Sequence, residues 1–324
     1  MGQNPFSTFK DKKILIIGDL MLDAYWYGNV DRISPEAPVP VVNIDQKENR
    51  LGGSANVALN ILPFGATPVL CGVIGVDESA HDLLDQLNQY GLSDTGIIQS
   101  KWRPTTVKTR IWSKRQQLIR LDTESKADLN ESESAALLER IISLADSLSP
   151  DVILFQDYNK GVLTLELIAK VLELAKIRNI PTVVDPKDNN FWAYKGVTLF
   201  KPNLSEIKRQ VKTGSVNDYA ILADTAFAKL DNRQLLITLS EKGIYFNDQL
   251  SEGVIPANIR DVADVCGAGD TVVSVAALGL ASNWPLKDIA ILSNLAGGLV
   301  CEEVGVVPVD PERLAQEYLV LVEK

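Results

Sequence analysis

Hydrophobic residues occur in short runs. These runs alternate with longer segments in which polar and apolar residues repeat with the period of an α-helix. The apolar runs predict buried strands at 12–19, 69–73, 152–155, 182–184, 198–200 and 235–239. The segments between and after them predict helices at 55–62, 80–90, 131–148, 165–178, 217–230, 267–282, 286–303 and 311–323. Strands that alternate with helices in this way are typical of a doubly wound, mostly parallel sheet with helices on both faces. We therefore predict an α/β fold.

Two segments depart from this rhythm. The proline-rich stretch around 39–44 predicts an extended edge strand, and 105–111 with 118–122 alternate polar and apolar residues as a hairpin does. Such strands could form a small sheet over the ligand crevice, a lid, or could be a plain edge extension or a dimer surface. Nothing resembles an interdomain linker. We predict a single domain over 1–324, with lid strands at about 36–45 and 105–122.

Acidic residues exceed basic ones by 42 to 32, which gives a net charge of −10. This balance argues against nucleic acid and anionic membrane surfaces as partners. There is neither an apolar run long enough to span a membrane nor a signal-peptide pattern. The three cysteines are scattered, as in reduced intracellular proteins, so we expect a cytoplasmic protein.

The single histidine, His81, lies in a polar helical stretch, where a surface position is expected. A general base must therefore be a carboxylate, Lys, Tyr or Cys. For the same reason, a bound metal is expected to be oxygen-ligated magnesium rather than zinc.

The segment 265–271 carries the clearest chemical signal. Gly267 and Gly269 allow the backbone to turn so that N–H groups point outward at the start of an apolar helix, which makes a site for an anion. Asp270 could take a proton from a hydroxyl as a phosphoryl group arrives there, or it could simply cap the helix. The third glycine of the dinucleotide fingerprint is missing, and the chain has no P-loop run.

Polar turns also follow the predicted strands. They occur at 18–23, 52–56, 157–161, 185–187, 201–206 and 238–243. An open α/β sheet binds its ligands at the carboxyl ends of its strands, so these turns are expected to meet at one edge.

Three of these motifs, in this order, resemble the PfkB/ribokinase family of carbohydrate kinases: Gly52-Gly53 with Asn56, Asn203 with Glu206, and Gly267-Ala268-Gly269-Asp270. A narrower similarity links 23–28, 32–42, 116–122 and 202–206 to the branch that phosphorylates D-glycero-β-D-manno-heptose 7-phosphate for lipopolysaccharide-core biosynthesis. The similarity spans essentially the whole chain. It implies a ribokinase-like fold, and either a stand-alone kinase or the kinase part of a protein that continues into a nucleotidyltransferase domain.

The resemblance implies an ATP-dependent phosphotransferase that uses Mg²⁺ and a homodimer formed through the lid strands. Asp270 would be the base for the anomeric hydroxyl, which attacks the γ-phosphorus of ATP to give the 1,7-bisphosphate. The backbone of Gly267, Ala268 and Gly269 would hold the charge on the group in transfer. Rival functions are another family kinase, acting on ribose, fructose phosphate or adenosine, and a non-catalytic sugar- or nucleotide-binding regulator.

The same resemblance assigns residues to the nucleotide and the sugar. Glu206, with Asn203, would organise the Mg²⁺–phosphate shell, and the nucleotide would be bordered by Leu204, Ser205, Ser240, Lys242, Gly243 and, at the adenine, Asn294. The sugar would be bound by Asp23 and Asn56 and approached closely at Gly52 and Gly53.

A sugar phosphate also needs cations for its distal phosphate. The candidates, of which we expect two to be ligands, are Lys108, Arg110, Arg120, Lys160 and Lys187. One departure from the family pattern is Cys266, where Thr is usual. A nucleophilic Cys266 is the alternative to a merely structural one, but nothing adjacent in the sequence would activate it.

Overall fold

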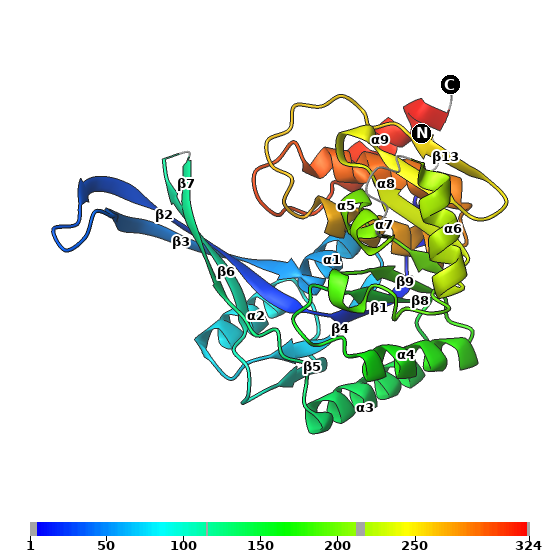
Figure 1. The fold of residues 1–324 in the computed structure, drawn as a ribbon, viewed down its shortest axis with the longest axis horizontal. Coiled ribbons are helices and arrows are strands. Elements are labelled where there is room, and N and C mark those ends of the chain that lie inside the picture. The colour runs from blue at the N-terminus through cyan, green and yellow to red at the C-terminus, as the bar shows by residue number, and fades with distance from the viewer. Residues whose placement is uncertain (1–4, 115, 212–217, 323–324) are drawn as a thin grey trace.

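A computed structural model of the chain describes residues 5–114, 116–211 and 218–322. Within them, a large central sheet carries helices on both faces, and a second, smaller sheet projects from one side of this body (Figure 1). This is the α/β architecture expected from the alternation of strands and helices.

The central sheet has nine strands in the order β13-β12-β11-β10-β9-β8-β1-β4-β5. Pairing is parallel from β11 through β5, and β12 and β13 extend the sheet in antiparallel fashion. In chain order the strands are β1 (Lys13–Gly18), β4 (Thr67–Ile74), β5 (Gly96–Gln99), β8 (Val152–Gln156), β9 (Thr182–Asp185), β10 (Leu199–Phe200), β11 (Gln234–Thr238), β12 (Ile244–Asn247) and β13 (Glu252–Ile255). Every strand predicted from an apolar run is present.

Both faces of the sheet are covered because its strands are apolar on both sides. In β1, Ile14 and Ile16 join one hydrophobic cluster, and Leu15 and Ile17 join the other. The first cluster packs under α1 (Ser54–Ile61), α2 (Glu78–Gln89), α7 (Ala268–Ala281), α8 (Leu286–Val300) and α9 (Pro311–Val322). The second packs under α3 (Glu131–Leu148), α4 (Leu165–Ile177), α5 (Leu204–Val211) and α6 (Tyr219–Leu230).

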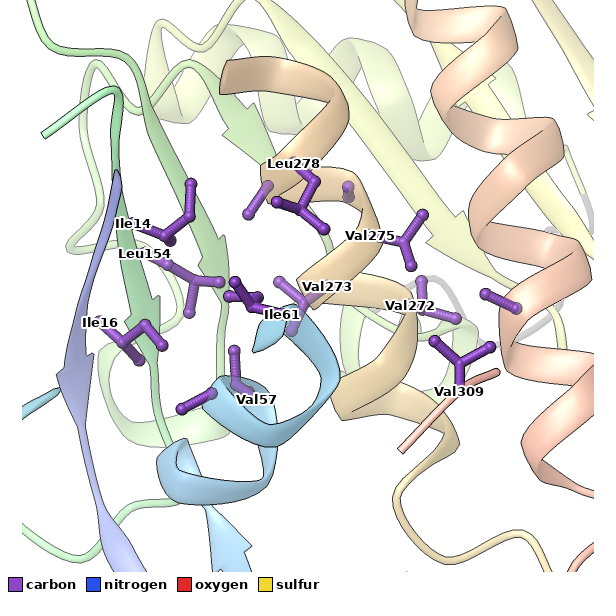
Figure 2. Close-up of a cluster of buried hydrophobic side chains, with 14 of the residues drawn as sticks. Ile14, Ile16, Val57, Ile61, Leu154, Val272, Val273, Val275, Leu278 and Val309 are labelled. Atoms are coloured by element: carbon purple, nitrogen blue, oxygen red, sulfur yellow. The ribbon is translucent and has the colours of Figure 1, made fainter. Parts of the chain in front are cut away.

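Helix α7 lies at the centre of the first cluster. All its residues from Asp270 to Ala281 are buried, as expected of a helix that is apolar around its whole circumference. Figure 2 shows Val273 and Leu278 of α7 in one cluster with side chains of α1, β1 and β8. The start of α7, where Asp270 lies, is thereby held firmly at the edge of the sheet.

The smaller sheet has the order β3-β2-β6-β7 and forms the lid. Its strands are β2 (Leu20–Ile33), β3 (Pro40–Gly53), β6 (Thr106–Ser113) and β7 (Gln116–Thr123). The hairpin predicted within 105–122 therefore occurs as β6 and β7. The other expected lid segment, 36–45, overlaps only the first part of β3.

Several other expectations needed correction. The polar turn expected at 18–23 is wrong beyond Asp19, because Asp23 lies within the long strand β2. The sequence pattern did not predict the strands β5, β12 and β13 or the helix α5. The helix expected at 217–230 appears as α6, and Asn217 lies outside the described residues. In the part of the chain that the structure describes, every helix is too short or too polar to cross a membrane.

Candidate active site

The glycine-rich turn before α7 holds Asp270 at the carboxyl edge of the sheet. Gly267 is the N-cap residue of α7, with a φ of 81° that a residue with a side chain rarely adopts. Asp270 follows in the first turn of the helix, and its carboxylate accepts hydrogen bonds from side chains of other elements. The carboxylate points into the interior of the site, so capping is not its role in this structure.

Three neutral donors from two other elements hold the Asp270 carboxylate. Asn56, in α1, donates to Oδ2 at 2.7 Å. Gln156, the last residue of β8, donates to Oδ1 at 3.0 Å, and the hydroxyl of Tyr158 donates to the same oxygen at 2.5 Å. The strand ends and the helix start therefore meet at this carboxylate.

Burial governs the acidity of Asp270. Desolvation raises its pKa to about 6, although the hydrogen bonds from Tyr158 and Asn56 act in the opposite direction. Among charged neighbours, Asp185 raises the pKa and Lys201 lowers it, and these two form an ion pair at 3.1 Å. A carboxylate with a pKa near 6 is ionised at neutral pH and basic enough to accept a proton.

The predicted sugar ligand Asp23 lies beside the glycine pair at the end of β3. A Cβ at Gly52 would lie 2.2 Å from the Asp23 Oδ2 atom, so only glycine leaves room for this carboxylate. Gly53 is the N-cap of α1, which carries Asn56. Asp23 is 5% exposed and forms an ion pair with Arg110 of β6. The part of the lid around Asp23 and Arg110, called the lid base below, therefore faces the site together with α1.

Of the five candidate cations, three are grouped at the lid base. Lys108 and Arg110 both lie on β6 near Asp23, and the charge of Lys160 acts on Lys108. Arg110 is paired with Asp23, and Lys160 is paired with Glu124 at 2.5 Å.

Lys108 differs from its neighbours because no carboxylate among the described residues pairs with it. Its ammonium group lies 5.0 Å from the centre of the Tyr158 ring. Burial, together with the charges of Lys160 and Arg110, lowers its pKa, although Asp23 acts in the opposite direction.

The other two candidates are placed differently. Arg120, on β7, lies opposite Arg110 in register but is more than half exposed, and it donates two hydrogen bonds to Asp122, at 2.9 and 3.0 Å. Lys187 follows β9 and pairs with Glu206. Arg120 is therefore the candidate that the structure supports least.

The motif Asn203–Glu206 forms the start of α5. Asn203 Oδ1 accepts from the backbone N–H of Glu206 at 2.9 Å, and Glu206 Oε2 accepts from the N–H of Asn203 at 2.8 Å, which is a reciprocal capping arrangement. Ser205 donates to Asn203 at 2.8 Å, while Leu204 is the first residue of the helix. Glu206 is buried, 3% exposed, and its other oxygen is held by Lys187.

The remaining nucleotide candidates gather around the end of β13. A bridge between Asn203 and Thr238 places the end of β11 next to the Asn203 motif. Ser240 and Lys242 form the turn that follows, and Gly243 packs against the carbonyl of Ile255. Asn294, in α8, donates to the carbonyl oxygen of Pro256 at 2.8 Å. The structure thus brings Ser240, Lys242, Gly243 and Asn294 to one region.

Cys266 lies just before the glycine turn. Its backbone N–H donates to Asp264 at 3.0 Å, and burial together with that carboxylate raises the pKa of its thiol to about 11. The thiol is therefore protonated at neutral pH, which argues against a nucleophilic role.

Sequence reasoning missed the partners of the base. Gln156 is the last residue of β8, and Tyr158 comes two residues later. Asp185 is the last residue of β9, and Lys201 directly follows β10. The only signal available was their position after predicted strands. A position at a strand end indicates the correct edge of the sheet but not the atom that each side chain contacts.

Comparison with known proteins places the chain among kinases. The family model described as pfkB family carbohydrate kinase matches residues 11–313. The bifunctional protein HldE of Methylobacillus flagellatus is 41% identical over 308 residues, which are 94% of this chain and 62% of that protein. HldE of Pseudomonas aeruginosa is 40% identical over 310 residues, 94% of this chain and 63% of that protein. The chain thus spans less than two thirds of the length of these relatives.

Solved structures agree on the fold. Phosphofructokinase-2 from Escherichia coli superposes with a TM-score of 0.78 at 18% identity, covering 97% of this chain and 100% of that one. Ribokinase from Arabidopsis thaliana, complexed with ribose and ATP, gives 0.72 at 16% identity, covering 94% and 99%. The site geometry, the family match over 11–313 and the similarity to the HldE proteins lead to one conclusion: the chain belongs to the pfkB family of carbohydrate kinases.

Proposed function

We propose that the chain transfers the γ-phosphoryl group of ATP to O1 of D-glycero-β-D-manno-heptose 7-phosphate and releases the 1,7-bisphosphate and ADP. The observation that carries this proposal is a base and an uncompensated cation in one site. Asp270 and Lys108 both contact Tyr158, one through its hydroxyl and the other over its ring. A substrate with a hydroxyl at one end and an anion at the other matches this pair.

The charges at the lid base favour an acceptor that carries a phosphate. Lys108 is surrounded by Arg110 and Lys160, and their combined charge makes its ammonium form less favourable. A phosphate bound there would supply the missing negative charge and strong acceptor oxygens. Neutral acceptors such as ribose or adenosine would leave Lys108 without an anion, so the structure favours a phosphorylated sugar over these rivals.

The transfer step follows from the position of Asp270. The carboxylate takes the proton of the O1 hydroxyl, O1 forms a bond to the γ-phosphorus, and the bond to the β,γ-bridging oxygen breaks to release ADP. The backbone N–H groups at the start of α7 would stabilise the charge that develops on the phosphoryl oxygens. Lys187, between Glu206 and Tyr158, is in place to contact the ATP phosphates rather than the distal phosphate of the sugar.

Magnesium would be held mainly by the ATP phosphates and water. Among the described residues, no group of three Asp, Glu, His or Cys side chains could form a metal cage. Both Glu206 oxygens already accept hydrogen bonds, one from Lys187 and one from Asn203. These contacts fit a carboxylate that orders the hydrated ion, because Mg²⁺ retains several waters and bridges to substrate phosphates. The ion would neutralise charge on the group in transfer.

A panel of acceptors tests the proposed function. ADP release would be measured with Mg²⁺–ATP and heptose 7-phosphate, fructose 6-phosphate, ribose or adenosine. We expect turnover that is strongly selective for the heptose phosphate. Turnover on another acceptor would retain the mechanism and reject the substrate, and binding of nucleotide and sugar with no turnover on any acceptor would indicate a regulator.

We also propose that a second copy of the chain covers the outer face of the lid. Trp26, Ile111 and Ile119 are neighbours in register on the face opposite Lys108 and Arg110, and Ile119 is 50% exposed. Two identical apolar sheets can stack around a twofold axis and bury each other. We expect a dimer in analytical ultracentrifugation and a monomer for Ile119→Asp; a monomeric wild-type protein would contradict the dimer.

We assign the proposed reaction to lipopolysaccharide-core biosynthesis and its location to the cytoplasm. The sequence similarity at 23–42 supports the pathway. The three thiols, Cys71, Cys266 and Cys301, are all free, which supports a reducing compartment.

A further inference from the structure

Tyr158 stands between the base and two lysines, and the proposed reaction assigns it no role. Its hydroxyl donates to Asp270 Oδ1, as does the amide of Gln156. We propose that Tyr158 is a positioning residue that saturates Oδ1 and leaves Oδ2 of Asp270 as the atom that accepts the substrate proton. The catalytic meaning of this inference rests on the proposed function, whereas the hydrogen-bond arrangement can be tested without it.

The assignment of the two oxygens follows from counting acceptor positions. Each carboxylate oxygen has two lone pairs and accepts about two hydrogen bonds. Oδ1 accepts from Gln156 at 3.0 Å and Tyr158 at 2.5 Å, so both of its positions are used. Oδ2 accepts only from Asn56, at 2.7 Å, among the described residues. One position on Oδ2 is therefore open to an incoming hydroxyl.

The orientation of Asn56 supports this count. Asn60 donates to Asn56 Oδ1 at 3.2 Å, and Asn60 Oδ1 in turn accepts from the Thr271 hydroxyl at 2.9 Å. The amide of Asn56 must therefore turn its N–H toward Asp270. Its donation fixes the Oδ2 atom without filling both lone pairs.

Tyr158 is itself held on several sides. Its backbone N–H donates to Asp19 Oδ2 at 2.7 Å. Over its ring lie Lys108 from the lid, at 5.0 Å from the ring centre, and Lys187 from the turn after β9, at 5.8 Å. Cations are attracted to the face of an aromatic ring, so both lysines favour the observed ring position. The hydroxyl is thus aimed at Asp270 by strand ends and lid together.

Charged side chains from several elements surround Asp270. Asp185 at the end of β9 and Lys201 after β10 act on Asp270, as it in turn acts on Lys108 and Lys187. Tyr158→Phe leaves all these charges in place and removes one hydrogen bond. Since that bond favours the carboxylate, its loss raises the pKa of Asp270.

Titration of the Asp270 carboxyl group tests the inference without any turnover. Protein labelled with ¹³C at the aspartate carboxyl carbons would be titrated by NMR, with Asp270 assigned as the resonance missing in Asp270→Asn. We expect Tyr158→Phe to move the midpoint upward by about one pH unit, the size of one hydrogen bond to a charged group. In active enzyme, the acid limb of kcat/KM moves the same way while KM for ATP stays unchanged.

Tyr194→Phe is the matched control. Tyr194 is buried and, like Tyr158, donates to a carboxylate, Asp157 at 2.7 Å, but among the described contacts it makes no bond to Asp270. It should leave the Asp270 midpoint unchanged. An Asp270 midpoint that is also unchanged in folded Tyr158→Phe overturns the inference.

A second variant keeps the inference testable if Tyr158→Phe does not fold. Replacing Tyr158 by a fluorinated tyrosine keeps the ring and hydroxyl but makes the hydroxyl a stronger donor. The Asp270 midpoint should then move downward, and an unchanged midpoint rejects the role of Tyr158. If the wild-type protein phosphorylates no sugar, the proposed function fails while these titrations still decide the inference.

Discussion

The environment of Asp270, the proposed base, suits a carboxylate that accepts a proton. Desolvation raises its pKa to about 6, and the donors that hold it, Asn56, Gln156 and Tyr158, are all neutral. A cationic donor in their place would favour the carboxylate so strongly that it became a weak base. Neutral donors position the group and leave it basic near neutral pH.

Replacing the base should abolish most of the activity. Asp270→Asn keeps the size of the side chain but cannot accept the substrate proton, so we expect kcat to fall about 10²- to 10⁴-fold. ATP binding, measured by calorimetry, should be retained because the proposed nucleotide residues lie around Asn203 and Ser240. Unchanged turnover would reject the role of Asp270 as base.

At the scale of single residues, the sequence indicates Asp270 as the candidate base but does not indicate its environment. Two glycines before an apolar helix indicate an anion site with Asp270 in it, because backbone geometry there is local. The bonds from Gln156 and Tyr158 depend on how β8 is placed against α7, more than a hundred residues away. No local pattern carries that information.

Among the elements, the lid has two chemically different faces. Side chains alternate along its strands, so Lys108 and Arg110 face the site while Ile111 faces away. The hairpin β6–β7 could be predicted because this alternation is regular. Strand β2 could not, because its first residues, Leu20 to Tyr25, are all buried and hide the period of two.

Removing the unpaired lid cation should weaken sugar-phosphate binding specifically. We expect Lys108→Met to raise KM for the sugar phosphate about 10- to 100-fold, the loss of one charge-assisted hydrogen bond. KM for ATP should change little.

Lys47→Met is the matched control for Lys108→Met. Lys47 is an exposed lysine of the same lid, over the Trp26 ring on the outer face. Its replacement should leave both KM values unchanged, and an equal loss in the two variants would show that the lid merely lost stability.

At the scale of the whole molecule, Asp19 is a second buried acid close to the proposed site. Asp19 is 1% exposed, and burial together with the charge of Asp157 raises its pKa to about 6 from 3.8. Its Oδ2 accepts from the backbone N–H groups of Tyr158 and Lys160, while Oδ1 has no partner among the described residues. Asp19 thus fixes the turn that carries Tyr158, at a cost in stability.

This cost should depend on pH. Below about pH 4 Asp19 is protonated in both folded and unfolded chains, so it contributes nothing. Between about pH 4 and pH 6 the unfolded chain has lost this proton while the folded chain still holds it, so stability falls as the pH rises, and the full cost is present above about pH 6. A shift of about 2 units corresponds to up to about 3 kcal/mol.

Asp19→Asn tests this linkage, since the amide oxygen can still accept both backbone bonds. We expect urea unfolding to show a gain of about 1–3 kcal/mol at pH 8 that disappears at pH 4. Asp94→Asn, at an exposed carboxylate, should show no such difference. A gain that is equal at both pH values would contradict the linkage.

The global fold was the most predictable level. Apolar runs such as Ile14–Ile17 are buried on both faces, so their pattern signals parallel strands without knowledge of their partners. The antiparallel extension by β12 and β13 was missed although β12 and β13 are as long as β9, which was predicted; β13 alternates exposed and half-buried residues and so carries no buried apolar run. Strand order, and hence which strand ends meet at Asp270, came only from the structure.

The position of the transferred phosphate is the sharpest test of the proposed reaction. The chain would be incubated with Mg²⁺–ATP and D-glycero-β-D-manno-heptose 7-phosphate, and the product examined by ³¹P NMR with proton coupling. We expect a second phosphorus resonance coupled to the anomeric proton, which is absent with Asp270→Asn. A phosphate on any other hydroxyl, or an anomeric phosphate formed equally well by Asp270→Asn, would contradict it.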